Sequence, residues 1–200
     1  MKRIFVAINL PEEIKNKIGE EKKEIKELFP EELRETMFKW VKKENLHITL
    51  LFIGYINEKI LPQLNLTVKK IIEGFKSFSL KLEKITYGPP ASAGRPKIIP
   101  PRLIWLDIEK KPDLLELAQK LKQGVEKTGI LNRYEKREFS PHITLARIKT
   151  WQWRKIEPEE RPKIDKKINL NFEVNSIEIM ESKLKRGSSE YTVLESFKLT

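Results

Sequence analysis

The tetrad His-Ile-Thr-Leu occurs twice in this chain of 200 residues, at residues 47–50 and again at residues 142–145. The two tetrads contain the only histidines of the sequence. If each tetrad is part of a β-strand, its histidine and threonine share one face, while its isoleucine and leucine point into the core. A single tetrad of this kind is usually just a strand that shows polar residues to water. Because both histidines fall at the same step of a repeated pattern, we expect them to share a function.

The segments that lead to the two tetrads follow the same order. Each tetrad is preceded by a strand and by a helix that begins at a proline, where the missing N–H costs nothing. In the first half we predict a strand at residues 4–10, a helix that begins at Pro11 and a tetrad strand at residues 46–54. In the second half we predict a strand at residues 103–108, a helix that begins at Pro112 and a tetrad strand at residues 139–145. Duplication of one unit explains this order most economically. The alternative is a chance recurrence, since such units are common.

A segment rich in proline and glycine, residues 88–101, separates the two halves. It cannot form regular structure, and long loops of this kind often carry function. We therefore predict one two-lobed domain over residues 1–200, with a first repeat at about residues 1–87 and a second at about residues 102–200. The other expected elements are a helix over residues 60–75, strands over residues 78–82, 168–174 and 177–179, and a hairpin that turns at Gly187.

Composition narrows the class of protein without deciding it. The net charge is +11, from 40 Lys and Arg against 29 Asp and Glu, so the chain attracts polyanions such as nucleic acid. A lysine-rich, solubilising surface explains the charge equally well. The sequence contains no cysteine, which excludes disulfides, thiolate metal sites and cysteine nucleophiles. No apolar run approaches the roughly 18 residues that cross a bilayer. We expect a cytoplasmic protein with no membrane partner.

Two imidazoles and two hydroxyls in one small volume suit displacement at phosphorus. Near neutral pH one imidazole can be neutral and the other protonated, which provides a base and an acid. Threonine hydroxyls can donate hydrogen bonds to non-bridging oxygens, and nearby Lys or Arg can stabilise the developing charge. A metal site is the main alternative. The tetrads contain no carboxylate or thiolate, so two histidines alone make an incomplete ligand set, and we predict neither metal nor cofactor.

With its flanking residues, the pattern resembles the two-histidine phosphoesterase superfamily, and within it the RNA 2′,3′-cyclic phosphodiesterases, also called 2′-5′ RNA ligases. The resemblance covers nearly the whole chain. It rests on an ordered set of segments: Arg3-Ile4-Phe5-Val6-Ala7-Ile8, Trp40-Val41, Glu44-Asn45-Leu46 before the first tetrad, Gly54, Pro101-Arg102-Leu103-Ile104-Trp105-Leu106, Pro141 and Ala146-Arg147 around the second tetrad, Glu181-Ser182-Lys183-Leu184, and Tyr191.

The resemblance implies an α+β fold of two pseudo-symmetric lobes, each an antiparallel sheet backed by helices, with a central active-site cleft. It implies hydrolysis of RNA 2′,3′-cyclic phosphate ends to 2′-phosphomonoesters without metal. Carried over by position, His47 is the proton donor and His142 the proton acceptor, while Thr49 and Thr144 hold phosphate oxygens. Arg147 matches an anion-binding arginine. Strict alternation places Arg147 opposite His142, so this role requires the strand to end or twist there.

The expected partner is RNA with a 2′,3′-cyclic phosphate end, a tRNA-derived one being a candidate, and we expect a monomer. Two other functions stay open, namely 2′-5′ RNA ligation by the reverse type of displacement and a non-catalytic RNA-binding module. Further candidates for RNA contact are Trp151 and Trp153, which more often only anchor a loop, Arg154 and Lys155 beside them, Lys183, Lys185 and Arg186 near the hairpin turn, and Arg102.

Overall fold

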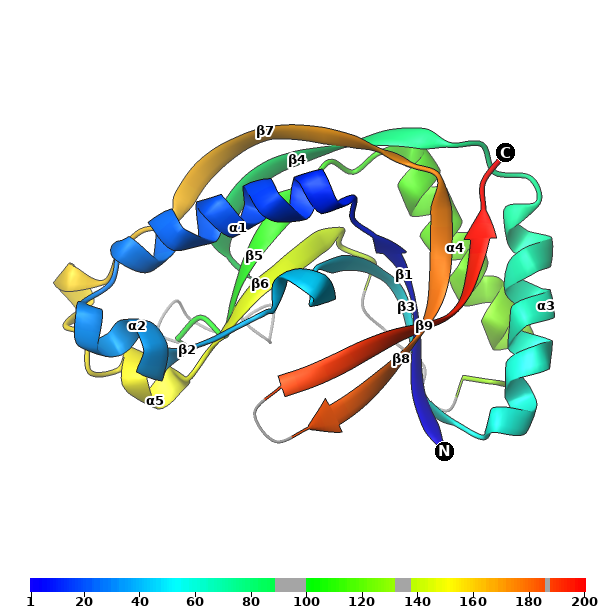
Figure 1. The fold of residues 1–200 in the computed structure, drawn as a ribbon, viewed down its shortest axis with the longest axis horizontal. Helices are drawn as coiled ribbons and strands as arrows, with labels where there is room; N and C mark the ends of the chain where they lie inside the picture. The colour runs from blue at the N-terminus through cyan, green and yellow to red at the C-terminus, as the bar shows by residue number, and fades with distance from the viewer. Residues whose placement is uncertain (89–99, 132–137, 186–187) are drawn as a thin grey trace.

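Two antiparallel sheets form the framework of the protein (Figure 1). The computed structural model describes residues 1–88, 100–131, 138–185 and 188–200. The four-stranded sheet has the order β3 (His47–Ile56), β1 (Lys2–Asn9), β8 (Ser176–Lys185) and β9 (Ser188–Lys198). The five-stranded sheet has the order β2 (Phe38–Trp40), β6 (His142–Ile148), β5 (Leu103–Ile108), β4 (Phe78–Tyr87) and β7 (Asp165–Val174). The predicted α+β fold of two sheets is confirmed.

The helices predicted to begin at Pro11 and at Pro112 and the helix predicted over residues 60–75 are present, whereas α2 and α5 were not predicted. Pro11 caps the first helix, whose first turn contains two glutamates and whose last turn contains a lysine, charges that suit the helix dipole. Pro112 is itself the first residue of its helix. The helices are α1 (Glu12–Glu27), α2 (Glu31–Met37), α3 (Leu61–Ile72), α4 (Pro112–Lys127) and α5 (Thr150–Trp153), with 3-10 turns η1 (Lys43–Asn45), η2 (Glu58–Ile60) and η3 (Pro158–Glu160).

Each sheet takes strands from both halves of the chain. β8 and β9 complete the sheet of β1 and β3, whereas β2 and β4 join β5 and β6. The helices are exchanged in the same way, since α1 lies across the five-stranded sheet and α4 lies with α3 beside the four-stranded one (Figure 1). Two contacts hold α1 there: Lys22 Nζ donates to the Val41 carbonyl at 2.5 Å, and Lys166 of β7 forms ion pairs with glutamates of α1. The repeat boundaries stay a prediction.

One hydrophobic core joins the two lobes. Buried side chains of both sheets and of α1, α3 and α4 belong to a single cluster. It includes the apolar residues of both tetrads, because Ile48 and Ile143 are fully buried. A shared core keeps the two sheets in one fixed orientation, which is what a site built from both of them requires. None of the helices within the described residues has the length and apolar character needed to cross a bilayer.

The first tetrad strand runs further than predicted. β3 continues past Gly54 to Ile56, and its pairing with β1 shifts register just before that glycine. Gly54 has φ of +93°, a left-handed conformation that glycine adopts without strain. The glycine therefore allows an irregularity within the strand and does not end it. The proline-rich segment from residue 89 to 99, the connection over residues 132–137 and the turn at Gly187 lie outside the described residues.

Replacement of Ile143 by alanine tests the shared core. We expect the free energy of unfolding to fall by about 2–5 kcal/mol, because the side chain leaves a cavity between the strand and the helices. Urea unfolding followed by circular dichroism measures the loss. Leu66→Ala is the matched control, since Leu66 is 61% exposed and its removal should change stability little. Equal effects of the two substitutions would contradict this account of the core.

Candidate active site

The two tetrads occupy equivalent positions in the two sheets. On β3, His47 and Thr49 are half-buried while Ile48 and Leu50 are buried, as the alternation predicts. β6 repeats this pattern from His142 onward. Residues of β3 and β6 approach each other although the strands belong to different sheets. The polar faces of the two tetrads therefore meet between the lobes.

A cleft of about 530 Å³ lies where these faces meet. Both histidines and both threonines line it, and so does Arg147. The tertiary structure therefore brings together all five residues that the sequence singled out for catalysis and substrate binding. Other lining side chains come from β1, from β2 and the segment after it, from β3 and from the β8–β9 hairpin, among them Arg3, Phe5, Lys39, Lys42, Asn45, Phe52, Ser182 and Tyr191.

The backbone determines the tautomer of each histidine. The Nδ1 atom of His47 lies 2.7 Å from the Asn45 carbonyl oxygen, and that of His142 lies 2.7 Å from the Ser140 carbonyl oxygen. A carbonyl can only accept, so Nδ1 carries the hydrogen in both rings and the neutral rings have their lone pair at Nε2. In His47 this Nε2 atom lies 3.0 Å from the Thr49 hydroxyl, which can donate to it. Each ring is thus held ready to accept a proton at Nε2.

Aromatic side chains support both rings. The His47 ring packs against Phe5 at a centroid distance of 5.0 Å and meets Tyr191 edge-on at 5.1 Å. The His142 ring lies 4.3 Å from the ring of Trp105. These contacts limit rotation of the imidazoles about χ2, because a turned ring would collide with its neighbours. The aromatic residues act as supports for the histidines, and Trp105 itself is buried.

Burial lowers the pKa of both histidines. It is the largest effect on each ring, and the hydrogen bond to a backbone carbonyl partly opposes it by favouring the charged form. The pKa of His47 is lowered further by the positive charge of His142 and of Lys15. In His142 the nearby carboxylate of Asp107 acts in the opposite direction. The two rings therefore share the hydrogen bond from Nδ1 to a backbone carbonyl but have different electrostatic surroundings.

Arg147 reaches the cleft because β6 contains a bulge. Trp105 pairs with Thr144, but the next residue of β5, Ile104, pairs with Ala146, so Leu145 is an extra residue in β6. The extra residue reverses the alternation, which returns the exposed Arg147 to the face of His142. The condition that the sequence set for Arg147, a change in the strand before it, is thus met by a bulge. In the sequence, the bulge corresponds to two successive apolar residues, Leu145 and Ala146.

The same bulge occurs at the equivalent position of β3. Ala7 pairs with Thr49 and Val6 with Leu51, so Leu50 is the extra residue. Phe52 therefore faces the cleft five residues after His47, as Arg147 does five residues after His142. Its side chain is 44% exposed and the Arg3 guanidinium lies 4.8 Å from its ring centroid. Sequence analysis did not predict Phe52 or Arg3 as site residues.

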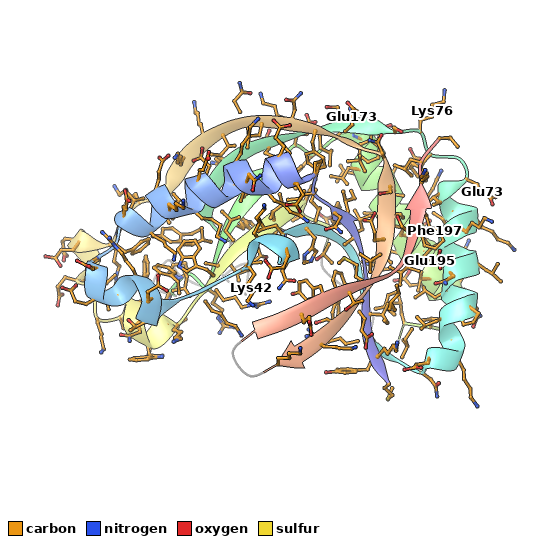
Figure 2. The ribbon with its side chains drawn as sticks, viewed as in Figure 1. Lys42, Glu73, Lys76, Glu173, Glu195 and Phe197 are labelled. Atoms are coloured by element: carbon orange, nitrogen blue, oxygen red, sulfur yellow. The ribbon has the colours of Figure 1, made fainter. Side chains whose placement is uncertain are left out.

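The charge of the cleft is positive. Its lining contains the four cations Arg3, Lys39, Lys42 and Arg147, and no Asp or Glu among the described residues. Lys39 of the edge strand β2 pairs across the sheet with Arg147. Lys42 lies in the segment next to the β8–β9 hairpin (Figure 2). Such a lining concentrates positive charge where an anionic group would sit.

Trp151 and Trp153 do not line the cleft. Trp153 is buried, with its ring edge-on to Tyr87 at 5.2 Å, so it anchors the α5 segment and is not available to stack on RNA. Trp151 is 57% exposed and packs under the Lys155 ammonium, 5.1 Å from the ring centroid, outside the cleft lining. Arg102 is exposed and also lies outside the lining.

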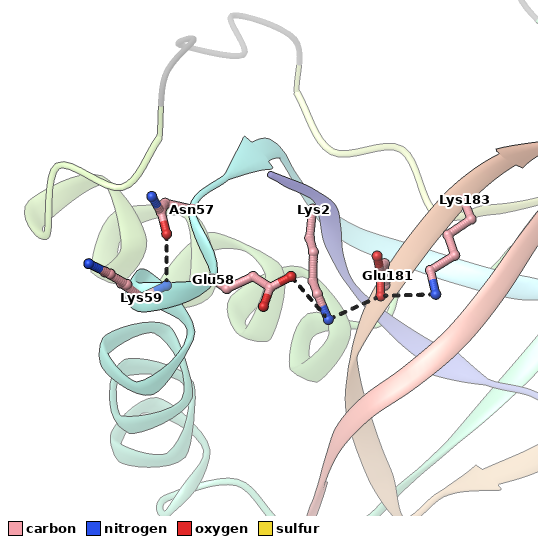
Figure 3. Close-up of polar contacts among 6 residues, drawn as sticks. All are labelled: Lys2, Asn57, Glu58, Lys59, Glu181 and Lys183. Carbon is pink, nitrogen blue, oxygen red and sulfur yellow. Dashed lines mark hydrogen bonds and ion pairs between the residues drawn. The ribbon is translucent and has the colours of Figure 1, made fainter.

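The basic residues near the hairpin are engaged in ion pairs. Lys183 lies 3.9 Å from the buried Glu181, which also pairs with Lys2 at 3.4 Å, and Lys2 reaches Glu58 of η2 at 3.7 Å (Figure 3). Lys185 pairs with Glu190 across the hairpin at 2.6 Å. These contacts connect β1 and β8 at the end of the sheet. Arg186 lies outside the described residues.

Two His–Thr pairs on facing sheets, in a cationic cleft, define a phosphoesterase of the two-histidine class. The model of the 2′-5′ RNA ligase superfamily matches residues 19–186, and the chain belongs to that family. A relative from Thermotoga maritima, named RNA 2′,3′-cyclic phosphodiesterase, is 30% identical over 166 residues, which cover 82% of this chain and 80% of the relative.

The fold agrees with solved structures of the family. The crystal structure of Escherichia coli LigT in complex with 3′-AMP has a TM-score of 0.77 and 27% identity, and the match covers all of this chain and 98% of LigT. The crystal structure of TT0787 from Thermus thermophilus also has a TM-score of 0.77, with 29% identity over 98% of this chain and 97% of that one.

The lowered histidine pKa values predict a loss of stability in mild acid. An unfolded histidine titrates near 6.5, and the folded pKa lies below that, so the unfolded state binds more protons as the pH falls through this window. Stability is fully present above the unfolded pKa and decreases below it. We expect His47→Gln to lose less stability between pH 7.5 and pH 5.5 than the unmodified chain. Urea unfolding at both values of pH measures this, and equal losses would contradict the buried, neutral state of His47.

Proposed function

We propose that the protein hydrolyses 2′,3′-cyclic phosphate ends of RNA to 2′-phosphomonoesters, with His47 as the proton donor and His142 as the proton acceptor. The observation that carries the proposal is the pair of Nε2 atoms, each oriented by an Nδ1–H bond to a carbonyl, on facing strands of one cationic cleft. The assignment of His47 as the donor and His142 as the acceptor follows from the family resemblance. The name of the relatives, RNA 2′,3′-cyclic phosphodiesterase, supports the same reaction and RNA as the substrate.

In-line displacement at phosphorus explains why two histidines on facing lobes are useful. The attacking water and the leaving oxygen lie on opposite sides of the phosphorus atom, so the base and the acid must approach from different directions. His142 Nε2 takes a proton from the attacking water while the water oxygen forms a bond to phosphorus. The bond from phosphorus to the ribose 3′-oxygen breaks, and His47 donates a proton to that oxygen. The products are a 2′-phosphomonoester and a free 3′-hydroxyl.

The remaining polar residues would stabilise the charge on the phosphoryl oxygens. Thr49 and Thr144 each lie two residues from a histidine on the same strand face, so their hydroxyls are placed to donate to non-bridging oxygens. Arg147 adds a planar guanidinium that suits the oxygens of a phosphate. Donors fixed before the reaction stabilise charge without having to reorganise. We assign these three residues to substrate binding.

The proposed reaction uses no metal ion. Within the described residues, no group of three or more His, Cys, Asp or Glu side chains is placed to hold a metal ion together. The cations of the cleft would perform the charge neutralisation that a metal performs elsewhere. Ligation to a 2′-5′ linkage would use the same groups in the same roles, with a ribose 5′-hydroxyl in place of the attacking water and the 3′-oxygen again leaving. A cytoplasmic location, a monomeric state and a tRNA-derived substrate stay predictions.

Alanine substitutions of the histidines test the mechanism. We expect His47→Ala and His142→Ala each to lower kcat by at least about a hundredfold, the lower range for a positioned acid or base. The assay is ring opening of an oligonucleotide with a 2′,3′-cyclic phosphate end, with EDTA present and no nucleotide added. Trp151→Ala, outside the cleft, serves as the control. Near-normal turnover of a folded histidine variant would remove that histidine from the mechanism, and activity that requires added metal would overturn the metal-free proposal.

A substrate with a 3′-sulfur atom separates the donor from the acceptor. A 3′-alkoxide is too basic to leave without a proton, whereas a thiolate, whose conjugate acid has a pKa of about 8.5, needs little protonation. His47→Ala should therefore recover much of its lost rate on the sulfur substrate, and His142→Ala should not. The ratio of mutant to unmodified kcat/KM on each substrate is the measurement. Recovery of His142→Ala instead would reverse the two roles.

A further inference from the structure

The two halves of the site are nearly equivalent in geometry. In each half the tetrad strand pairs with one neighbouring strand in the same register up to the same bulge. His47 and His142 have the same hydrogen bond from Nδ1, to the carbonyl two residues before each. In the proposed reaction, however, the two rings have opposite roles, since one donates a proton and the other accepts one. A difference in charge between equivalent positions around the two rings would distinguish them.

The residues directly opposite the two histidines differ in charge. Asn9 of β1 pairs with His47, and Asp107 of β5 pairs with His142. The two positions correspond, because each lies two residues beyond the residue that pairs with the tetrad threonine. One histidine therefore faces a neutral amide and the other a carboxylic acid across the sheet.

Asp107 and His142 form a close cross-strand pair. The Ile108 N–H donates to the Pro141 carbonyl at 3.4 Å, so residues 108 and 141 form the hydrogen-bonded pair, and residues 107 and 142 form the adjacent pair without such bonds. In pairs of the second kind the side chains come closer together, with Cβ atoms about 4.5–5.5 Å apart on the same face of the sheet. Asp107 is half-buried, so water screens its charge only in part.

The other charged groups near Asp107 and the two histidines do not provide the same difference in charge between the surroundings of His142 and those of His47. On the far side of Asp107, Lys84 of β4 is its cross-strand neighbour, but the Lys84 ammonium lies 3.4 Å from Asp165 of β7, which serves as its ion partner. Glu83 of β4 and Asp165 add negative charge near Asp107. On the side of His47, His142 and Lys15 of α1 contribute positive charge, although the Lys15 ammonium also has an ion partner, Glu12, at 3.2 Å.

One buried carboxylate lies near the Asn9 position, and its oxygens are already engaged. Glu178 of β8 accepts the Asn9 backbone N–H at 3.0 Å, the Ser176 hydroxyl at 2.6 Å and the Ser196 hydroxyl at 3.3 Å. These bonds hold the Glu178 carboxylate at the end of the strands. Asp107 is thus the carboxylate that distinguishes the two histidines.

We propose that Asp107 is a positioning residue that holds a negative charge beside His142 and gives it a higher proton affinity than His47. Within the proposed function, on which this consequence rests, the imidazolium of His142 forms when the ring takes the proton of the attacking water. The carboxylate of Asp107 stabilises that charge as it develops. The electrostatic effects on the pKa values agree in direction, because Asp107 raises the pKa of His142 whereas the charges of His142 and Lys15 lower that of His47. Burial raises the pKa of Asp107 itself, so its effect is present only above that pKa.

Titration of the two histidines by NMR tests the proposal without substrate. The chain has two histidines, so their ring signals are assigned with the single variants His47→Gln and His142→Gln. We expect Asp107→Asn to lower the pKa of His142 by about one unit, the lower end of the effect of an adjacent opposite charge. His47 should move much less. Asp107→Ala removes the same charge and should give the same shift, and Asp113→Asn, which removes an exposed carboxylate at the start of α4, is the matched control that should leave His142 nearly unchanged.

The reciprocal substitution moves the charge to the other half of the site. Asn9→Asp places a carboxylate opposite His47 and should raise the pKa of that ring, with folding confirmed by circular dichroism. If neither Asp107 variant lowers the pKa of His142, or if both histidines shift equally, the proposal is wrong. A folded Asn9→Asp variant with an unchanged His47 would also overturn it.

The pH dependence of kcat/KM tests whether the charge of Asp107 affects the proposed reaction. Because the proposal gives His142 the higher pKa of the two rings, the basic limb of the profile reports His142, and Asp107→Asn should move that limb to lower pH. A profile of unchanged shape, with only its height reduced, would mean a purely structural role for Asp107 and would contradict the proposal. Because the NMR titration needs no substrate, the effect of Asp107 on His142 can be confirmed even if the protein does not hydrolyse cyclic phosphates. The two conclusions are therefore tested independently.

Discussion

The site depends on the pairing of each tetrad strand with its neighbour, and above all on one extra residue in each. Alternation places a histidine and a threonine on the cleft face and two apolar side chains in the core. Without the bulges at Leu50 and Leu145, the residue five positions after each histidine would point away from the cleft. With them, Arg147 and Phe52 return to it. A small backbone irregularity thus adds a cation to one half of the site and an aromatic side chain to the other.

The exchange of strands and helices between the lobes keeps the two halves of the site in a fixed relation. Each sheet contains strands from both halves of the chain, and one core extends through both sheets. Separation of the lobes would therefore expose buried apolar surface and break sheet pairing, which is far more costly than the bending of a linker. In the proposed mechanism, a base and an acid on different lobes need this rigidity, because their separation must match the two sides of one phosphorus atom.

The two histidines differ only through the side chains around them, because the fold gives both halves of the site the same backbone geometry. Both rings are half-buried, both donate through Nδ1, and both have a threonine two residues away. The differences lie in the neighbours: Asn9 against Asp107, Ala7 against Trp105, and Phe52 against Arg147. Each of these pairs occupies corresponding positions. Divergence after a duplication would produce this pattern, since the backbone is retained while the side chains acquire separate roles.

The sequence by itself determined the catalytic candidates and most of the helices and strands, and its resemblance to a known family indicated the α+β class. The repeated tetrads identified His47, Thr49, His142 and Thr144, and the flanking prolines placed the starts of α1 and α4, because these features depend on local alternation and local backbone geometry. The successive apolar pairs Leu50-Leu51 and Leu145-Ala146 were a visible trace of the bulges.

Only the tertiary structure decided which strands pair and which side chains reach the cleft. That β8 joins β1 and β4 joins β5 cannot be obtained from periodicity, since alternation states which face is apolar and not which strand lies beside it. The approach of Arg3, Lys39 and Tyr191 to the histidines, and the burial of Trp153 away from them, follow from that pairing. Contacts between residues far apart in the chain depend on how a whole sheet packs, and no short stretch of sequence contains that information.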